Sequence, residues 1–286
     1  MKTADRLFAR ARRRLMLLLL SALASFAPLS AAAQTMLDVP GAAATVASGI
    51  NDSGIIVGNY YSENGDEHSF LYNGSTFKTI DFPGADWTEA AGINQAGDVV
   101  GYYGYVADKL IHGFLRTSAG LFSSIDLQGR FNTMPEGINS SGTIVGCMHN
   151  PGTMHGWVMQ NGALVSRSPA YAMYTAINDA GTIVGWGRFH KSPGSIRSFV
   201  LSGAGQVDIS FPGANNTQAY GVNTFGDVVG WYGPDGPGGL GFLYHNGAFT
   251  SIEVSGATLT HALGINIGGT IVGYYLDATG YHGFIR

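Results

Sequence analysis

The sequence contains a single cysteine, Cys147, which excludes an intrachain disulfide and leaves a buried core as the source of stability. The signatures of common catalytic sites are also missing. There is no G-x-S-x-G, no H-E-x-x-H, no P-loop, and no S-x-D-x-G-x-T-W box of the kind found in sialidase propellers. Cys147 has no evident catalytic partner, so we expect its thiol to be buried. The sequence therefore indicates no catalytic constellation and no cofactor.

Residues 1–33 have the three parts of a secretory signal peptide. A basic start is followed by an apolar stretch, residues 15–29, and by three alanines that favour cleavage before Gln34. The apolar stretch is interrupted by serines and is short for a membrane-spanning helix, so a membrane anchor is the weaker alternative. We therefore expect a cleaved signal peptide over residues 1–33. The mature chain, residues 34–286, is expected to be secreted or periplasmic and to have no membrane span.

Acidic residues predominate once the first 33 residues are removed. Residues 1–33 hold six of the 15 basic residues and one of the 19 acidic residues, so the remaining chain has a net charge of about −9. A surface of that sign repels the phosphate backbone of nucleic acids. We therefore expect no nucleic-acid partner.

One pattern occurs six times along the chain. The copies are GINDSGIIVG (49–58), GINQAGDVVG (92–101), GINSSGTIVG (137–146), AINDAGTIVG (176–185), GVNTFGDVVG (221–230) and GINIGGTIVG (264–273). Their shared asparagines lie 39 to 45 residues apart and are Asn51, Asn94, Asn139, Asn178, Asn223 and Asn266. A repeat of about 40–45 residues has the length of one four-stranded blade of a β-propeller.

Each repeat divides into four short apolar segments, rich in β-branched residues, that predict strands. In the second repeat these segments are residues 88–94, 98–103, 112–116 and 121–126. The fourth segment follows a third one only five times, but residues 35–42 near the N-terminus resemble it. We therefore predict an all-β fold with one domain, a six-bladed β-propeller over residues 34–286. Its N-terminal strand is predicted to pair with the last blade, at residues 282–286, and to close the ring. A parallel β-solenoid is the alternative.

Glycines recur at two positions of the repeat. Those of the first turn are expected to have positive φ, and those of the second strand to allow close approach of a neighbouring backbone or ring. The turn glycines are Gly54, Gly97, Gly142, Gly181, Gly226 and Gly268, and the strand glycines are Gly58, Gly101, Gly146, Gly185, Gly230 and Gly273. The repeat asparagines are expected to order these turns rather than to bind a ligand or calcium.

Four repeats carry a histidine in the third strand, namely His68, His112, His155 and His282. Zinc needs its ligands within about 2 Å of one ion, and equivalent points of separate blades lie too far apart for that. We therefore expect no metal site. Each histidine is expected to bond a polar group of its own blade, such as a turn carbonyl or the repeat asparagine.

The motif GIN-x-x-G-x-IVG, followed by HGF or HSF and by an aspartate–proline–glycine–alanine tail, resembles the HAF-repeat family of extracellular bacterial proteins. The resemblance covers nearly all of residues 35–286. It implies secretion from a bacterium and a β-propeller-like array, and it implies no reaction. Arg197 and Leu240 replace the histidine in two repeats, which argues against any function that needs six equivalent histidines.

Connections on the two sides of the predicted propeller differ in length. The first-to-second and third-to-fourth turns are short, whereas the connections on the opposite side are longer and vary between repeats, as on the binding side of many repeat proteins. Aromatic and polar residues on that long-loop side suit sugars or peptides. The candidate ligand-binding residues are Trp87, Tyr103, Tyr105, Arg188, His190, Tyr232 and His261. Trp186, Trp231 and Tyr274 directly follow the second-strand glycines and are expected to pack between blades.

The sequence favours an exported, non-enzymatic propeller that binds a glycan, a peptide or an envelope component through its long-loop side. The main alternative is a polysaccharide or lactone hydrolase or lyase with a site at the channel mouth. Its candidate carboxylates are Asp86, Glu136, Asp235 and Asp277. A structural surface or matrix protein is the third hypothesis.

Overall fold

The computed structural model describes residues 34–286 except residues 108, 128–131, 151, 169–170 and 189–194. The predicted signal peptide, residues 1–33, lies outside the described residues. The described residues form strands β1 to β24 joined by turns and loops, so the expectation of an all-β fold is confirmed. They contain no apolar helix of membrane-spanning length.

Each repeat contributes a first, a second and a third strand, followed by a shorter fourth. The first strands are β2 (Ala44–Ile50), β6 (Trp87–Ile93), β10 (Asn132–Ile138), β14 (Ala172–Ile177), β18 (Thr217–Val222) and β22 (Leu259–Ile265). The second strands are β3 (Ile56–Tyr61), β7 (Val99–Gly104), β11 (Ile144–Asn150), β15 (Ile183–Gly187), β19 (Val228–Tyr232) and β23 (Ile271–Leu276). The third strands are β4 (Glu67–Tyr72), β8 (Ile111–Arg116), β12 (Thr153–Gln160), β16 (Arg197–Ser202), β20 (Leu240–His245) and β24 (Tyr281–Ile285). The fourth strands are β5 (Phe77–Thr79), β9 (Phe122–Ile125), β13 (Ala163–Arg167), β17 (Gly205–Ile209), β21 (Ala248–Ile252) and, from the N-terminus, β1 (Thr35–Leu37).

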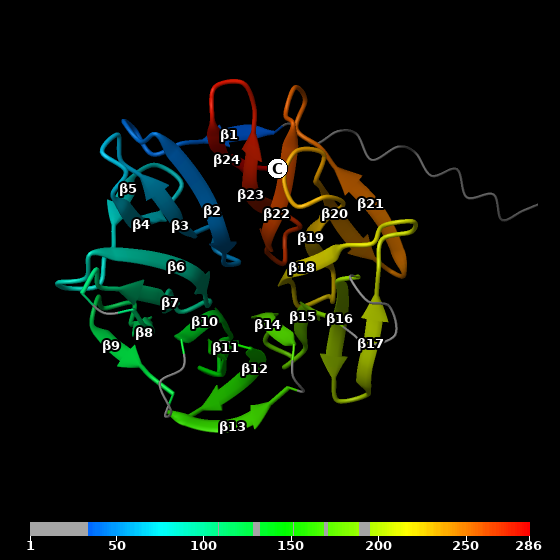
Figure 1. Ribbon diagram of the computed structural model, residues 1–286, viewed down its shortest axis with the longest axis horizontal. Coiled ribbons are helices and arrows are strands. Elements are labelled where there is room, and N and C mark those ends of the chain that lie inside the picture. The colour runs from blue at the N-terminus through cyan, green and yellow to red at the C-terminus, as the bar shows by residue number, and fades with distance from the viewer. Residues whose placement is uncertain (1–33, 108, 128–131, 151, 169–170, 189–194) are drawn as a thin grey trace, which may run out of the picture. The chain divides into compact units, whose positions relative to one another are not determined.

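Figure 1 shows these strands in sheets around a common centre, with the first strand of each repeat innermost. Three repeats form separate antiparallel sheets in the orders β2-β3-β4-β5, β6-β7-β8-β9 and β18-β19-β20-β21. Strands β10 to β17 belong to one sheet because His155 in β12 and Ala172 in β14 form a parallel bridge. The remaining sheet has the order β1-β24-β23-β22, with Met36 opposite Phe284. The predicted pairing of the N-terminal strand with the final segment is therefore confirmed.

The repeat asparagines order the first turn and also connect neighbouring repeats. Oδ1 of Asn51 accepts hydrogen bonds from the backbone N–H groups of Ser53 and Ile55, which confirms the predicted role in the turn. Nδ2 of Asn51 donates to the backbone carbonyl of Asn94, its counterpart in the next repeat, at 3.1 Å. The same donation runs from Asn94 to Asn139, from Asn139 to Asn178, from Asn178 to Asn223, from Asn223 to Asn266 and from Asn266 to Asn51.

Glycine is required at both predicted positions of the repeat. In the first turn Gly54 has a φ of 78°, and the next four repeats follow it. The prediction was wrong in the sixth repeat, where the positive φ of 77° belongs to Gly269, three residues after the asparagine, and not to Gly268. In the second strand, a Cβ atom on Gly58 would lie 2.0 Å from the backbone oxygen of Val46 and 2.9 Å from the Phe70 ring. This confirms the predicted close approach.

The core lies between neighbouring sheets. An aromatic residue at the same position of every third strand is at most 1% exposed, and the set is Phe70, Phe114, Trp157, Phe199, Phe242 and Phe284. The clusters around these rings draw residues from consecutive repeats, and one of them joins Leu37 and Val272 to Ile56 and Phe70 of the first repeat. Cys147 is buried in the core as predicted. Burial of each of these aromatic side chains contributes about 2 kcal/mol to the free energy of folding, so the contacts between sheets stabilise the array.

The third-strand histidines bond to their own sheets, as predicted, but their main partners differ from those expected. Nδ1 of His68 lies 2.7 Å from Asp81, and Nδ1 of His112 lies 2.8 Å from Asp126, each aspartate following the fourth strand. His155 instead bonds a backbone carbonyl, that of Ser168. In the last sheet the pair is His282 and Asp38, 2.7 Å apart, which fastens the N-terminal strand to the end of the chain.

Candidate ligand-binding site

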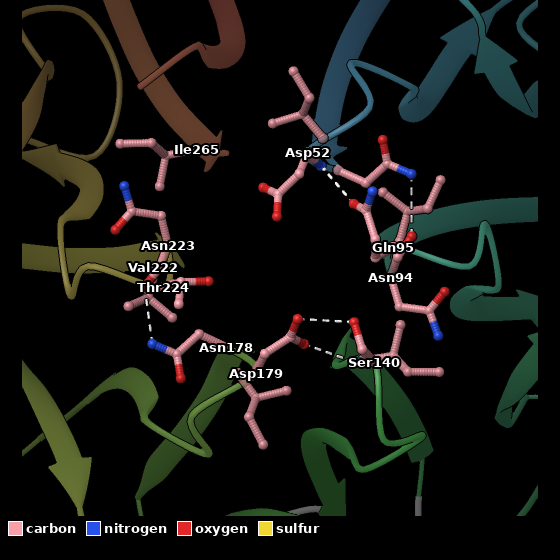
Figure 2. A pocket seen from close by; sticks show the side chains of 15 residues that line it. Asp52, Asn94, Gln95, Ser140, Asn178, Asp179, Val222, Asn223, Thr224 and Ile265 are labelled. Atoms are coloured by element: carbon pink, nitrogen blue, oxygen red, sulfur yellow. Dashed lines mark hydrogen bonds between the residues drawn. The ribbon is translucent and has the colours of Figure 1, made fainter. Parts of the chain in front are cut away.

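On the side of the short turns, the first strands leave only small cavities near the centre. One cavity of about 70 Å³ is lined by Asn51, Asn94, Asn178, Asn223 and their neighbours (Figure 2), and the next has about 80 Å³. A ring of branched side chains lines both, made by Ile50, Ile93, Ile138, Ile177, Val222 and Ile265. Each of these two cavities has room for only a few water molecules, so neither admits an organic ligand.

The glycine of the GIN motif explains why the centre is narrow here. A Cβ atom on Gly92 would lie 2.7 Å from the backbone oxygen of Glu136, and one on Gly264 would lie 3.2 Å from the Cα atom of Gly49. The first strands of neighbouring repeats therefore approach within van der Waals contact of their backbones at these glycines, where a side chain would crowd the neighbouring strand; the fourth repeat differs and has Ala176 at this position.

Two carboxylates that line the cavity of Figure 2 accept hydrogen bonds from a neighbouring repeat. Asp179 accepts hydrogen bonds from the backbone N–H and the hydroxyl of Ser140, at 2.7 and 2.8 Å (Figure 2). Asp52 accepts one from the backbone N–H of Ile267 at 2.8 Å. We therefore interpret Asp52 and Asp179 as links between repeats rather than as a ligand site.

On the opposite side lies a much larger cavity, which we call the long-loop pocket, with a volume of about 500 Å³. Its lining comes from the last three repeats and consists of Trp186, Arg188, Ile196, Gln218, Tyr220, Trp231, Asp235, His261, Leu263 and Tyr274. Three aromatic residues belong to second strands, four residues belong to the first strands β18 and β22, and three belong to the connections after β15 and β19. The size and composition are those of a site for a small organic ligand.

The two connections that contribute to the pocket are held against the next repeat. The backbone N–H of Ile196 donates to the carbonyl of Asn215, and that of Thr217 donates back to Ile196, both at 3.0 Å. In the same way the connection after β19 receives a hydrogen bond at Gly239 from Thr260. These backbone bonds place Arg188, Ile196 and Asp235 at the edge of the pocket.

Aromatic rings form one wall of the long-loop pocket. The rings of Trp231 and His261 stack with centroids 4.3 Å apart and an angle of 7° between their planes. Nδ1 of His261 and the hydroxyl of Tyr274 are 2.7 Å apart. Burial lowers the pKa of His261 to about 4, so its ring is neutral at pH 7. Burial also raises the pKa of Tyr274 to about 12, which keeps the hydroxyl protonated.

Two nitrogen atoms in this pocket lack a partner. His261 is 5% exposed, and neither its Nε2 nor Nε1 of Trp186 forms a hydrogen bond with a described residue. A buried polar atom without a partner costs about 1–3 kcal/mol, so a ligand that supplies the missing hydrogen bonds gains that energy on binding. Both residues line the long-loop pocket.

A second cavity, which we call the acidic cavity, lies next to the long-loop pocket. It has a volume of about 160 Å³ and shares Tyr220 and Leu263 with the pocket. Its lining includes Glu89 and Glu136 from the neighbouring strands β6 and β10. Burial raises the pKa of Glu136 to about 8, and Glu89 adds to this shift. Burial also raises the pKa of Glu89 to about 7, together with the nearby charge of Glu67.

The structure places two of the predicted ligand-binding residues in the long-loop pocket, Arg188 and His261. His190 lies outside the described residues. Tyr103 is a correction, because it is only 4% exposed, stacks on Phe82 at 3.7 Å and bonds Ser124, so it belongs to the core.

The remaining three predicted residues lie elsewhere and pack against their own surroundings. Tyr232 is half-buried and stacks on Phe211 with centroids 3.5 Å apart. Trp87 packs edge-on against Tyr102, and Tyr105 packs edge-on against Tyr103. None of the three is among the described residues that line the pocket.

Sequence reasoning set aside three aromatic residues that do line the pocket, Trp186, Trp231 and Tyr274. Trp231 packs between repeats as expected, on His261, yet it also contributes to the pocket wall. The alternation of side chains along the second strand could have identified these three residues. The residue directly after the second-strand glycine faces the centre, and the next residue faces the core, as Tyr103 and Tyr232 do.

No protein-family model matches the chain, and no curated protein matches its sequence. Similar solved structures are β-propeller proteins. TolB from Acinetobacter baumannii has a TM-score of 0.58 at 12% identity, over 82% of this chain and 64% of its own. The SapL1 lectin in complex with alpha methyl fucoside has a TM-score of 0.56 at 12% identity, over 85% and 92% of the two chains. The β-propeller domain of the Trilobed protease from Pyrococcus furiosus has a TM-score of 0.51 at 11% identity, over 84% and 95%.

These similarities show the fold. The described chain is a β-propeller, and the alternative of a β-solenoid is not supported. The chain spans only about 64% of the length of TolB, and identities near 12% carry no information on the ligand.

Proposed function

We propose that residues 34–286 form a closed propeller of six blades. Each repeat supplies four strands when β1 is counted with the last. The hydrogen bonds among the repeat asparagines return from Asn266 to Asn51, and Leu37 packs with Phe70 of the first repeat. The bridge between His155 and Ala172 involves one pair of residues, so it joins two neighbouring blades without merging them.

We also propose that the protein is an exported, non-enzymatic binding protein that takes a saccharide in the long-loop pocket. The observation that supports this most is the combination, in about 500 Å³, of indole rings with polar groups of both kinds. The apolar face of a sugar ring packs well on an indole, and its hydroxyl groups need donors and acceptors at the edge. Arg188 and Trp186 offer donors, and Asp235 offers an acceptor.

Two further lines support the proposal. The fold is shared with a lectin whose structure holds alpha methyl fucoside, although the identity of 12% transfers the fold alone. The six GIN copies support membership of the HAF-repeat family, and the basic and apolar N-terminal sequence supports export. A surface that carries a net charge of about −9 agrees with a partner other than nucleic acid.

The test is saccharide binding by purified residues 34–286. A glycan array would select ligands, and intrinsic tryptophan fluorescence would measure their affinity, because two of the four tryptophans line the pocket. The Trp186→Ala variant is expected to lose at least about tenfold in affinity, corresponding to about 1.4 kcal/mol. Trp87→Ala is the matched control, since Trp87 belongs to β6 and lies outside the pocket lining.

The outcomes separate the three hypotheses. Absence of binding to any polysaccharide or envelope saccharide, by a protein whose circular dichroism and melting are normal, would overturn the proposal. Release of new reducing ends from a bound saccharide would identify an enzyme instead. Growth of large assemblies in light scattering without saccharide binding would favour the structural role.

A further inference from the structure

The acidic cavity contains two carboxyl groups and no basic residue. Its described lining consists of Val46, Ser48, Asn59, Glu89, Ala90, Ala91, Tyr102, Glu136, Thr175, Tyr220 and Leu263. Glu89 accepts a hydrogen bond from the hydroxyl of Tyr102 at 2.6 Å and also shares a hydrogen bond with the carboxyl group of Glu67. Glu136 is half-buried, lines the cavity and forms no hydrogen bond or ion pair with a described residue. Two neighbouring carboxyl groups without a counter-ion are unusual at positions that are withdrawn from solvent.

The surroundings of this pair are acidic or neutral on every side. Glu67 in β4 lies close enough to raise the pKa of Glu89, and Tyr61 donates a hydrogen bond to Glu67 at 2.6 Å. Glu136 in turn raises the pKa of the Cys147 thiol behind it, after burial as the larger cause. No described cation offsets these charges, so both carboxyl groups retain protons at a pH where an exposed glutamate is ionised.

The acidic cavity and the long-loop pocket share the lining residues Tyr220 and Leu263, so they lie side by side. At about 160 Å³ it admits a small substituent with one or two water molecules and excludes a second sugar ring. The pocket beside it provides an independent indication of a ligand. Nε2 of His261, a residue that is only 5% exposed, forms no hydrogen bond with a described residue. A group attached to a sugar in the pocket therefore has a place to enter.

From this geometry we propose, resting on the proposed saccharide binding, that the ligand is an amino sugar with a free amine, whose ammonium group enters the acidic cavity between Glu89 and Glu136. The ammonium donates hydrogen bonds to the carboxylates and to Ser48, Thr175 or Asn59, which are acceptors in the same lining. Arg188 lies at the exposed edge of the pocket, where solvent and salt screen its charge. The overall charge of about −9 further favours a cationic saccharide.

Binding of the ammonium is expected to release protons. The cation stabilises the ionised carboxylates, so the pKa values of Glu89 and Glu136 fall from about 7 and about 8 on binding. No bond is made or broken, and the protons pass to the buffer. Affinity for the amine is therefore expected to rise as the pH increases from 6 to 8, as long as the amine of the sugar remains protonated.

The experiment compares a glucosamine oligomer with the N-acetylglucosamine oligomer of equal length by calorimetry on residues 34–286. The free amine is expected to bind at least tenfold more tightly at pH 6, where the sugar amine is protonated, with an enthalpy that depends on the ionisation enthalpy of the buffer. Glu136→Gln is expected to remove most of this preference and the proton release. Glu63→Gln, which removes the same charge from an exposed residue of the β3–β4 connection, is the matched control.

The failure of this inference is distinct from the failure of saccharide binding. Equal affinity for the two oligomers with no proton release would overturn the inference and leave saccharide binding intact. If neither oligomer binds and other saccharides bind without an amine preference, the inference is likewise wrong. If no saccharide binds at all, the melting temperature in methylammonium chloride tests whether the cavity binds an ammonium group. Stabilisation of the wild type, but not of Glu136→Gln, relative to equal sodium chloride supports the cavity as an ammonium site, and equal melting temperatures overturn it.

Discussion

The two sides of this propeller use the same repeat in opposite ways. On the short-turn side all six repeats place an asparagine and a branched residue at equivalent points, and the side chains fill the centre. On the long-loop side the repeats differ. The last three line an aromatic pocket, while residues of the first, second and third contribute most of the acidic cavity. The comparison shows that stability comes from what the repeats share and that the candidate site comes from what they do not.

Removing β1 is the change expected to damage the periodic part most. A chain that begins at Val39 loses the pairing of Thr35–Leu37 with β24, the buried Leu37 and the bond between Asp38 and His282. We expect a loss of about 4 kcal/mol in the free energy of unfolding. Urea unfolding of the two chains measures it. A loss below about 1 kcal/mol would contradict the closed ring.

Two glycines of the repeat separate steric need from backbone conformation. Gly101→Ala places a Cβ atom 2.0 Å from the backbone oxygen of Glu89, and we expect a cost of about 3 kcal/mol. Gly142→Ala has free space around its Cβ and strain only from its φ of 76°, so we expect about 1 kcal/mol. Thermal and urea unfolding would show whether this order holds, and equal costs would refute the steric explanation.

The hydrogen bonds among the repeat asparagines are expected to contribute more to the free energy of unfolding than the exposed hydrogen bonds beside them. Asn139→Ala removes the bond to the Asn178 carbonyl and the acceptor of the Thr143 N–H, and should cost about 2 kcal/mol. Ser140→Ala, at the exposed mouth, should cost about 0.5 kcal/mol although it loses a hydroxyl bond to Asp179. Stability measured in the same buffer tests the pair, and a larger effect at Ser140 would reverse the comparison.

On the long-loop side, ionisation of Glu136 is expected to make the free energy of unfolding depend on pH. The folded state holds the proton of Glu136 up to about pH 8, whereas the unfolded chain releases it near the ordinary value of 4.5. Stability is therefore lost as the pH rises from about 4.5 to 8, and Glu136→Gln escapes this loss. We expect the variant to exceed the wild type by on the order of 1 kcal/mol at pH 8.5 and to equal it at pH 4.5. Parallel curves at both pH values would contradict this assignment.

The smallest effect on stability is expected at Arg188. Its side chain is exposed at the pocket edge, so Arg188→Ala should change the free energy of unfolding by no more than about 0.5 kcal/mol. The same change should weaken saccharide binding several-fold, because a donor at the rim is lost. Melting curves and fluorescence titrations on one preparation would measure both. A loss of stability without a loss of affinity would move Arg188 from the site to the scaffold.

The features that recur six times could be predicted from the sequence, since each copy repeats the same physical requirement. The strands, the turn asparagines, the close-packed Gly58 position and the pairing of residues 35–37 with the last strand all followed from periodicity. The aspartate partners of His68, His112 and His282 could also have been predicted from the sequence. The two repeats that lack the histidine, at Arg197 and Leu240, also lack the aspartate, since Ser210 and Glu253 stand in its place.

The candidate site followed from the sequence only in part, because its residues break the period. Arg188 and His261 were found from loop position and residue type. Tyr103 was chosen wrongly, since alternation along β7 turns it to the core and gives the centre to Tyr102. The acidic cavity brings Glu89 and Glu136 together from strands 47 residues apart in the chain. Only the curvature of the array makes them neighbours.

The position of β1 also sets an order of events. Thr35–Leu37 leaves the ribosome well before its partner, because the residues it pairs with are Gly283 to Ile285. Leu37 and Asp38 therefore remain without their native contacts until His282 and Gly283 have been made. The sheet β1-β24-β23-β22 can be completed only after translation of these residues, so β1 is unpaired in every shorter nascent chain.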